Sequence, residues 1–298
     1  MNAVPQSVSS RPAYQQSDAS ALPGGSDASA LPGGSDASAL PGNDASALPG
    51  TDASALPGAA LACSNTFQED QANCTVAINT GIAAIANAAT AGNLLPGLHP
   101  NDLLSAYAIP AGSGNPTVAI VVAYDNPNAE SDLGVYRAAY GLTPCTSATG
   151  CFAKIDQNGG TSYPAANNAW SVESSLDVEM VSAICPNCKI LLVEANSPSF
   201  DDLGAAVNAA VAQGAKYVSN SYYGPEWKSE RNYDADYHHS GVAITVASGD
   251  QRSSFYPGVS PYVTTVGGTS LSNSGGIWQQ SAWSSDGAGC SKYEPRPS

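Results

Sequence analysis

The clearest pattern along the chain is an alternation of short apolar runs with longer amphipathic segments. Thr117 to Tyr124 is a continuous apolar run, as expected for a strand that is buried on both faces. The same kind of pattern predicts further strands at 189–194, 216–219, 242–247 and 262–266. Helices are predicted between them at about 129–140, 171–184, 200–213 and 229–239. This alternation predicts an α/β fold with a parallel sheet flanked by helices, and reactive groups beyond the carboxyl ends of the strands.

Two carboxylates, Glu173 and Asp177, lie four residues apart in the helix predicted at 171–184. Like charges at this spacing repel by about 0.2–0.5 kcal/mol, so the pair is either solvated or used. The helix also carries a predicted buried stripe with apolar residues at every fourth position: Val172, Leu176, Met180 and Ile184. At about 100° per residue, Glu173 falls inside the arc of that stripe and Asp177 just past its edge. We therefore expect both acids to face packed structure or a cleft.

A third acid follows the strand predicted at 242–247, which runs directly into Ser248-Gly249-Asp250. Gly249 permits a tight turn and a close approach of the backbone. Asp250 is thereby predicted at the carboxyl end of a strand, where a site is expected. A turn or helix-capping aspartate is the plain structural alternative.

The chain divides into three regions by composition. Residues 1–62 are a low-complexity tract in which the heptapeptide DASALPG occurs five times, and we expect them to be disordered. Residues 63–98 form an N-terminal extension or the remnant of a pro-segment, with a helical pattern from Ile82 to Ala91. Residues 99–298 hold the predicted α/β domain. The opening residues MNAVPQSVSSRPAYQQ show no signal-peptide pattern.

The chain is acidic, with 25 Asp and Glu residues against 10 Lys and Arg and a formal net charge of -15. This balance argues against nucleic acid as a partner, since binding to phosphates needs a basic surface. It also argues against anionic membranes, and no stretch is long and apolar enough to span a bilayer. An acidic surface suits secretion or acidic surroundings, and it equally keeps a protein soluble.

Six of the seven cysteines fall into close pairs along the chain: Cys63 with Cys74, Cys145 with Cys151, and Cys185 with Cys188. Local disulfides in an extracellular, secreted protein are the natural interpretation. Cys185-Pro-Asn-Cys188 also fits a redox motif or half a zinc site. The sequence has no second cluster to complete a zinc site, because the histidines are His99, His238 and His239. Cys290 has no neighbouring cysteine, and we expect its partner to lie beyond residue 298.

Seven segments taken together resemble the sedolisin family of serine–carboxyl peptidases, in the subtilisin-like clan. In chain order they are HPNDLLSAYAIP, TVAIVVAYDNPNAESDL, ESSLD, ICPNCKILLVEA, VSNSYYG, VAITVASGD and YPGVSPYVTTVGGTSL. They span about residues 98–298 in the order of the family. The resemblance implies a subtilisin-like parallel sheet flanked by helices, incomplete at its C-terminus.

The resemblance also implies roles for the three acids. Glu173 matches the general base that takes the proton of a serine nucleophile, and Asp177 matches the acid that orients this base. Asp250 matches the protonated aspartate that donates a hydrogen bond to the oxyanion. The implied activity is hydrolysis of peptide bonds in proteins through an acyl-enzyme at acidic pH, by a secreted monomer. The resemblance further implies calcium, whose ligand loop we expect to lie outside this chain.

The nucleophile of the family lies in a Gly-Thr-Ser-x-x-x-Pro motif, and no such motif is found in this sequence. Ser270 follows Gly268-Thr269 but matches an earlier, strand-associated motif of the family. None of the three histidines stands in a His-Gly-Thr context, which argues against a Ser-His-Asp triad. We therefore expect a C-terminally truncated domain that is inactive alone. The alternatives are a non-catalytic exported binding or display protein on a degenerate subtilisin-like scaffold, and a redox protein that uses Cys185.

Overall fold

The structure, a computed structural model, describes residues 59–61, 63, 67–74, 77–79, 98–110, 112 and 114–296. All of these belong to the larger of two units into which the chain divides, Asp36–Ser298. The heptapeptide repeats and the predicted helical stretch from Ile82 to Ala91 lie outside the described residues. Strand β1 (Ala59–Leu61) lies near the end of the region 1–62 that was predicted to be disordered. It pairs antiparallel with β2 (Ala77–Asn79).

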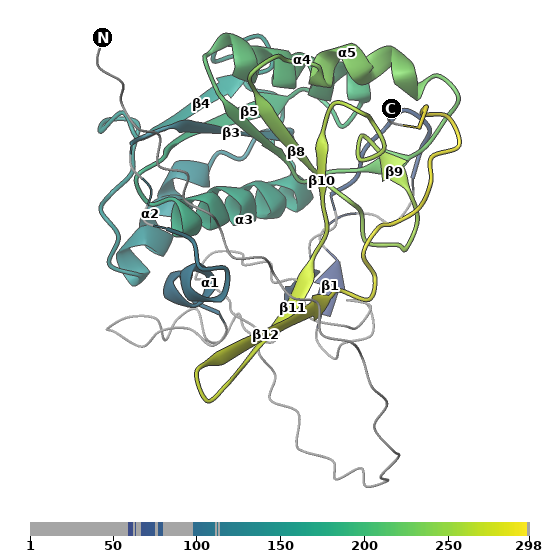
Figure 1. The fold of residues 1–298 in the computed structure, drawn as a ribbon. Helices are drawn as coiled ribbons and strands as arrows, with labels where there is room; N and C mark the ends of the chain where they lie inside the picture. Colours follow the sequence, from purple (N-terminus) through teal and green to yellow (C-terminus); the bar gives the residue numbers. More distant parts are fainter. Residues whose placement is uncertain are drawn as a thin grey trace, which may run out of the picture. The chain divides into compact units, whose positions relative to one another are not determined.

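A six-stranded sheet in the order β10-β8-β6-β3-β5-β4 forms the centre of this unit (Figure 1). Its strands are β3 (Thr117–Ala123), β4 (Phe152–Asp156), β5 (Lys189–Ala195), β6 (Tyr217–Asn220), β8 (Ala243–Ala247) and β10 (Thr264–Val266). Every neighbouring pair in this sheet is parallel. The predicted α/β fold with a parallel sheet is confirmed, and β4 is a strand that the hydrophobic pattern did not predict.

Helices cover both faces of the sheet, with α2 and α3 on one face and α4 and α5 on the other (Figure 1). The helices are α1 (Pro100–Ala106), α2 (Ala129–Ala139), α3 (Asn168–Ile184), α4 (Phe200–Ala212), the 3₁₀ helix η4 (Glu230–Tyr233) and α5 (Asp234–Tyr237). The strands β3 and β5 are almost wholly buried between these layers, which explains their continuous apolar sequence.

Two small antiparallel pairs complete the described part of the chain. Strands β7 (Gly224–Pro225) and β9 (Phe255–Tyr256) pair at the carboxyl side of β6 and β8. Strands β11 (Thr269–Ser274) and β12 (Ile277–Ala282) form a hairpin whose two-residue turn is Gly275-Gly276. Both turn glycines have positive φ, as the tight turns of hairpins require. The Trp278 indole donates to the Ser105 hydroxyl at 3.1 Å and so fastens the hairpin to α1.

The buried face of α3 differs from the predicted apolar stripe. Of that stripe, Val172 is buried, whereas Leu176, Met180 and Ile184 are half-exposed. The buried side chains of the helix are instead largely small or polar: Trp170, Val172, Glu173, Ser174, Ser175, Val178, Glu179, Ser182 and Ala183. The predicted apolar stripe was wrong because neighbouring side chains form hydrogen bonds with the polar side chains that α3 buries. The Arg137 guanidinium of α2, for example, donates to the Ser182 hydroxyl at 2.7 Å.

The three expected cysteine pairs are disulfides in the structure: Cys63–Cys74, Cys145–Cys151 and Cys185–Cys188. Cys290 is exposed and has a free thiol. Among the described residues, no helix is both long enough and apolar enough to cross a bilayer.

Candidate active site

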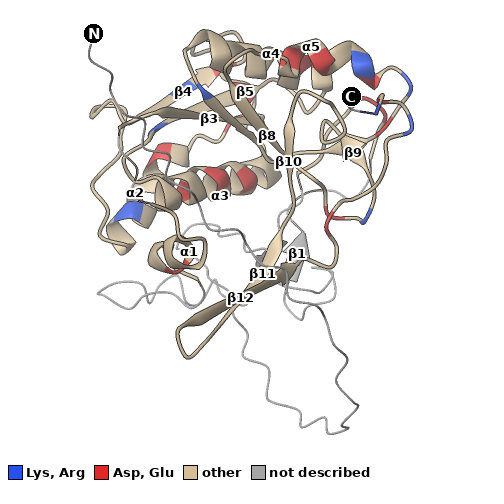
Figure 2. Ribbon diagram, viewed as in Figure 1, with Lys and Arg blue, Asp and Glu red and all other residues tan. Residues whose placement is uncertain are grey.

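The helix α3 begins at the carboxyl edge of the sheet, where the loop after β3 fixes its first turn. The Asn167 side chain caps the helix by accepting from the N–H groups of Ala169 (3.0 Å) and Trp170 (3.2 Å). The helical period then places Glu173 and Asp177 one above the other, and Figure 2 shows the acidic positions of α3 as red bands. The N-cap thereby sets the position of both acids relative to the strand ends.

Glu173 and Asp177 are a buried carboxyl pair. Glu173 is 6% exposed, and burial raises its pKa well above the ordinary value, helped by the charges of Asp177 and then Asp250. Burial also raises the pKa of Asp177 to about 7, against the opposing effect of a hydrogen bond from the Ser221 hydroxyl at 2.6 Å. The other carboxyl oxygen of Asp177 is buried without a hydrogen-bond partner among the described residues. The pair therefore holds protons at pH values where exposed acids are ionised.

Asp250 reaches the same site from the other side, through the turn after β8. That strand ends at Ala247, and Gly249 takes a φ of +94° that side chains rarely adopt. A Cβ on Gly249 would also lie 2.5 Å from the Phe255 ring. The charge of Asp250 raises the pKa of Glu173, so the two carboxyls lie within electrostatic range. The structure thus brings together all three acids that the sequence singled out.

The sequence did not point to Ser221, which is the residue that contacts Asp177 directly. Ser221 follows β6 immediately, so its side chain stands at the carboxyl edge of the sheet beside α3. The available signal was the predicted strand at 216–219, since polar residues just past a parallel strand are site candidates.

A second group of buried charges at the same edge was also missed. Glu194, the last residue but one of β5, is wholly buried, Lys154 lies on β4, and Asp125 follows β3. The Lys154 ammonium contacts the Asp125 carboxylate and lies 3.5 Å from a Glu194 oxygen. Burial raises the pKa of Glu194 to about 8, although the Asn126 N–H and Lys154 lower it. This cluster, Asp125–Lys154–Glu194, is an ion group rather than a set of bare acids.

Asn126 connects that ion group to α3. Its backbone N–H donates to Glu194 at 2.8 Å, and its side-chain amide contacts three oxygens of the helix. These are the Ser171 carbonyl at 3.0 Å and the hydroxyls of Ser174 and Ser175 at 2.8 and 2.9 Å. Asn126 is 2% exposed, so these bonds are shielded from water. The ion group therefore holds the turn of α3 that carries Glu173.

An extended stretch of the N-terminal region runs beside the acids. Residues 71 and 73 form antiparallel bridges to Ser199 and Tyr223 respectively, so this stretch lies between two main-chain edges. The Asn73 N–H donates to the Tyr223 carbonyl at 2.9 Å. Ala72 is fully buried, and the Cys74 sulfur lies 3.9 Å from the Ala169 carbonyl in the first turn of α3. The edge beside α3 therefore accepts an extended chain.

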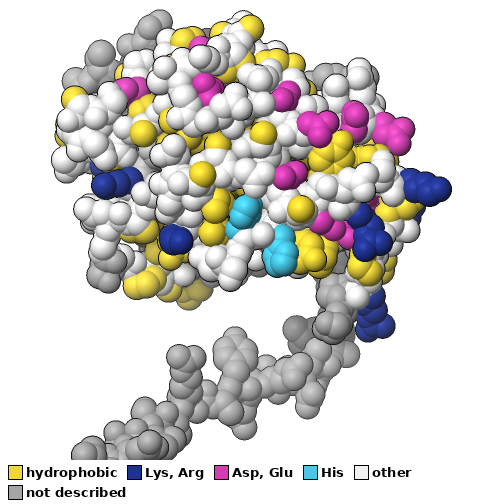
Figure 3. All heavy atoms as spheres, turned by 90° about the horizontal axis from the view of Figure 1, so that it is seen from above, with side chains coloured by type: hydrophobic (Ala, Val, Ile, Leu, Met, Phe, Trp, Pro, Cys, Tyr) yellow, Lys and Arg dark blue, Asp and Glu magenta, His cyan; other side chains and the backbone are white. Residues whose placement is uncertain are grey.

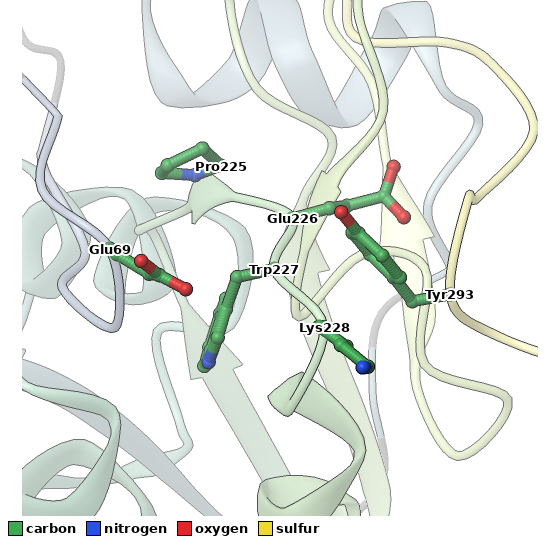
Figure 4. A pocket seen from close by; sticks show the side chains of 6 residues that line it. All are labelled: Glu69, Pro225, Glu226, Trp227, Lys228 and Tyr293. Carbon is green, nitrogen blue, oxygen red and sulfur yellow. The ribbon is translucent and has the colours of Figure 1, made fainter.

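A pocket of about 340 Å³ lies along the continuation of that edge (Figure 4). Its lining side chains are Glu69, Pro225, Glu226, Trp227, Lys228 and Tyr293. Figure 4 shows Glu69 on one side and Tyr293 on the other, with the 225–228 segment between them. The pocket is therefore assembled from three segments that are far apart in the sequence.

His238, His239 and Ser270 each make local contacts within the fold. The His238 ring stacks on Tyr262 with centroids 4.1 Å apart, and His239 bonds to the Asp236 carbonyl at 3.0 Å. Histidine side chains are visible at the surface in Figure 3. Ser270 pairs with Ser281 in the β11–β12 hairpin. It therefore does not stand at the start of a helix, where the nucleophile motif of the resemblance would place the serine.

Among the described residues, no group of three or more His, Cys, Asp or Glu side chains is arranged to hold a metal ion. The calcium implied by the resemblance therefore has no fitting ligand set in this part of the chain.

Comparisons with known proteins agree with this architecture. No family model matches the chain. Kumamolisin from Bacillus sp. (strain MN-32) is 27% identical over 227 residues, which cover 67% of this chain and 40% of that protein. The chain thus spans less than half the length of this curated relative.

A solved structure shows the fold. Pseudomonas sedolisin, a serine-carboxyl proteinase complexed with two molecules of pseudo-iodotyrostatin, superimposes with a TM-score of 0.54 at 22% identity. The match covers 67% of this chain and 64% of that chain. Together with the parallel sheet, this superposition shows that the chain has a subtilisin-like α/β fold similar to that of sedolisin, and its sequence is similar to that of kumamolisin.

Proposed function

We propose that this chain provides the acid half of a serine–carboxyl peptidase site that hydrolyses peptide bonds in proteins at acidic pH. The observation that carries the proposal is the group of buried Glu173 with half-buried Asp177 and Asp250 at the carboxyl edge of the sheet. Similarity to kumamolisin supports peptidase chemistry in general, and the assignment of individual roles is our own inference.

In the proposed mechanism, ionised Glu173 takes the proton of a serine hydroxyl as that oxygen attacks the substrate carbonyl. Asp177 carries the proton that links it to Glu173 and fixes the direction of the base, while Ser221 holds Asp177. Protonated Asp250 donates to the oxyanion that forms. Collapse of the tetrahedral intermediate breaks the C–N bond, and the leaving amine takes the proton from Glu173. We assign no residue of the described chain as the serine.

Acidic pH follows from the charges of the three acids. Three carboxyls in one buried site repel each other when all are ionised, so the site retains protons. A neutral Asp250 and one ionised member of the Glu173–Asp177 pair satisfy both roles at once. As the pH rises, Asp250 loses the proton that it donates, and the oxyanion is no longer stabilised.

The extended stretch beside the acids supports a peptide as the substrate. Main-chain groups of Tyr223 and of residues 198–200 already pair with residues 70–73 in an antiparallel arrangement. Edges of this kind bind extended peptides through backbone hydrogen bonds, with side chains pointing alternately to either side. The same edge leads to Ser221 and so to Asp177.

The purified protein should be incubated with a denatured protein substrate between about pH 3 and pH 8, across the range in which carboxyls titrate. Because we assign no described residue as the serine, we expect this chain alone to cleave little or no substrate. When the chain is joined to a segment that carries the Gly-Thr-Ser-x-x-x-Pro motif, we expect cleavage with an acidic maximum and a loss of about 10²–10⁴-fold in Glu173→Gln, as for removal of a general base. Glu179→Gln is the matched control, because it removes another buried carboxyl from the same helix.

A maximum above neutral pH would contradict the acid mechanism. So would a joined protein in which Glu173→Gln is as active as Glu179→Gln. A folded joined protein that binds peptides but cleaves none at any pH would favour a non-catalytic binding protein on the same scaffold. Cleavage that Ser270→Ala abolishes would place the nucleophile in β11.

A further inference from the structure

The C-terminal strap, which we define as residues 284–296, crosses the molecule without helix or strand. Figure 1 shows this yellow segment running from the hairpin past β9 towards α5. It makes two separate sets of contacts, one with the turn that carries Asp250 and one with a group of buried carboxyls. Neither set belongs to the roles proposed above.

The first half of the strap holds the turn before Asp250. The Asp286 carboxylate accepts from the Ser248 hydroxyl at 2.6 Å, and the Gly287 N–H donates to the Gly249 carbonyl at 2.7 Å. The approach is so close that a Cβ on Gly287 would lie 1.8 Å from the Ser248 carbonyl oxygen. The conformation of the Asp250 turn is therefore coupled to the docking of the strap.

The second half of the strap is fastened to carboxyl groups. Glu226 accepts from the Ser291 hydroxyl and, at 3.0 Å, from the Lys292 N–H. The Glu294 side chain is 2% exposed and enters the structure beside η4, where Arg231 lies 3.9 Å away. Both Glu294 oxygens are buried, and no donor bonds to either of them within the described chain. A carboxylate in this position is costly unless it is protonated.

The surroundings of Glu294 are rich in acids. Glu230 is wholly buried, and one of its oxygens accepts from the Trp227 N–H at 2.7 Å while the other has no partner in the described chain. Asp234 accepts from the Ser260 hydroxyl at 2.7 Å. The carboxyl latch, as we name the group, comprises Glu226, Glu230, Asp234 and Glu294, faced by Arg231 and by the Tyr256 hydroxyl. One guanidinium does not neutralise four ionised carboxylates.

We propose that the carboxyl latch is an acid-dependent fastening: when Glu230 and Glu294 are protonated it holds the strap against η4 and α5, and when these two acids are ionised it releases the strap. Release frees the turn that carries Asp250 and removes Tyr293 from the wall of the pocket in Figure 4. The latch stands independently of the proposed peptidase chemistry, because it concerns the docking of the strap alone.

The direction of the pH effect follows from the docked state. Burial raises the pKa of Glu294 to about 7, helped by Asp234 and opposed by Arg231. Burial likewise raises the pKa of Glu230 to about 8, opposed by the Trp227 N–H and helped by Glu226. Raised carboxyl pKa values mean that docking is fully favoured below about pH 4.5 and is lost as the pH rises through 7 to 8.

Hydrogen exchange measured by mass spectrometry tests the latch on the chain itself. Protection factors of peptides from residues 284–296, corrected for the intrinsic pH dependence of exchange, are compared at pH 5 and pH 8.5. We expect protection to fall at least about tenfold at pH 8.5, the equivalent of one pKa unit. Peptides from β3 and β5 report whether the sheet stays folded at both pH values.

Glu294→Gln should retain strap protection at pH 8.5, because its amide is neutral and donates to Asp234. Glu230→Gln should retain part of it, and Glu69→Gln, an exposed acid outside the latch, should behave as wild type. The proposal is overturned if wild-type protection is equal at both pH values. It is also overturned if Glu294→Gln loses protection as the wild type does, or if its strap is unprotected already at pH 5.

Discussion

Two groups of carboxyls that are largely shielded from solvent lie at the carboxyl edge of the sheet, one at the ends of β3 and β5 and the other on α3, and they differ in their counter-charge. Asp125 and Glu194 share the ammonium of Lys154, which also lies 4.2 Å from the centre of the Tyr163 ring. Glu173 and Asp177 form no ion pair with a Lys, Arg or His within the described part of the chain. The first group contains a cation that pairs with its carboxyls, whereas the second contains none and depends on protons alone for its neutralisation.

This difference separates a structural role from a chemical one. A buried ion group joined to its neighbours by hydrogen bonds fixes geometry, and here it holds α3 through Asn126. A buried acid pair without a cation has raised pKa values and can exchange protons near its working pH. The ion group thus provides the rigid support on which the acid pair is placed.

Removing the cation should have the largest effect. Lys154→Met leaves Glu194 and Asp125 buried without their counter-charge, and breaking such a group costs about 3–5 kcal/mol. We expect this loss in the free energy of unfolding, measured with urea at about pH 9, where Glu194, whose pKa is about 8, is ionised. The loss should be smaller at pH 5, because Glu194 then carries a proton. Lys189→Met, at an exposed position of β5, is the control, and an equal effect from both variants would refute the contrast.

Asp250 tests the chemical side of the comparison, on the basis of the proposed function. In the chain joined to a segment that carries the serine motif, Asp250→Ala should lower kcat by about 10²–10³-fold, as for other lost oxyanion donors. Asp250→Asn should recover much of the rate, because its amide donates without needing a proton from solution. The asparagine variant should also remain active at higher pH than the wild type, which a pH profile of kcat will show. If kcat of the asparagine variant falls at high pH just as kcat of the wild type does, Asp250 does not have the proposed role.

The hydrophobic pattern was enough to predict most of the sheet and its helices. Runs such as Thr117 to Tyr124 are apolar because both faces are covered, and this property is local to the sequence. Strand β4 was missed because Phe152–Asp156 is an edge strand of the sheet and contains Lys154 and Asp156. Their burial depends on partners that the sequence does not place beside them. The apolar stripe of α3 failed for the same reason.

The three acids of the candidate site were predictable because each has a local signal. Glu173 and Asp177 share a helix face, and Asp250 follows a strand. Ser221, Asn126 and the ion group were not predicted because their importance lies in contacts between distant segments. The Ser221–Asp177 bond joins residues 44 positions apart, and the Asn126–Glu194 bond joins residues 68 apart. Only the three-dimensional structure shows which residues at the strand ends contact the same helix.

The proton-neutralised pair should also make stability depend on pH. Asp177 has an ordinary pKa of 3.8 in the unfolded chain and about 7 in the folded one. Between these two pH values the folded state binds more protons than the unfolded state. The contribution of Asp177 to the free energy of unfolding is therefore greatest below pH 3.8 and declines as the pH rises towards 7. We expect Asp177→Asn to remove about 2 kcal/mol of the decline between pH 5 and pH 8, measured by urea unfolding. Glu130→Gln, on α2 outside the site, should leave the decline unchanged.

Ser221→Ala should have the smallest effect and gives the finest test of the acid pair. The variant removes the hydroxyl that donates to Asp177, with an expected cost of about 1 kcal/mol at pH 7.5. Because this hydrogen bond favours the ionised form, its loss should raise the pKa of Asp177 further. Carboxyl titration by ¹³C NMR measures that shift, and Ser219→Ala on β6 is the matched control. A pKa that stays unchanged in Ser221→Ala would mean that burial alone controls Asp177 and that Ser221 has no part in the site.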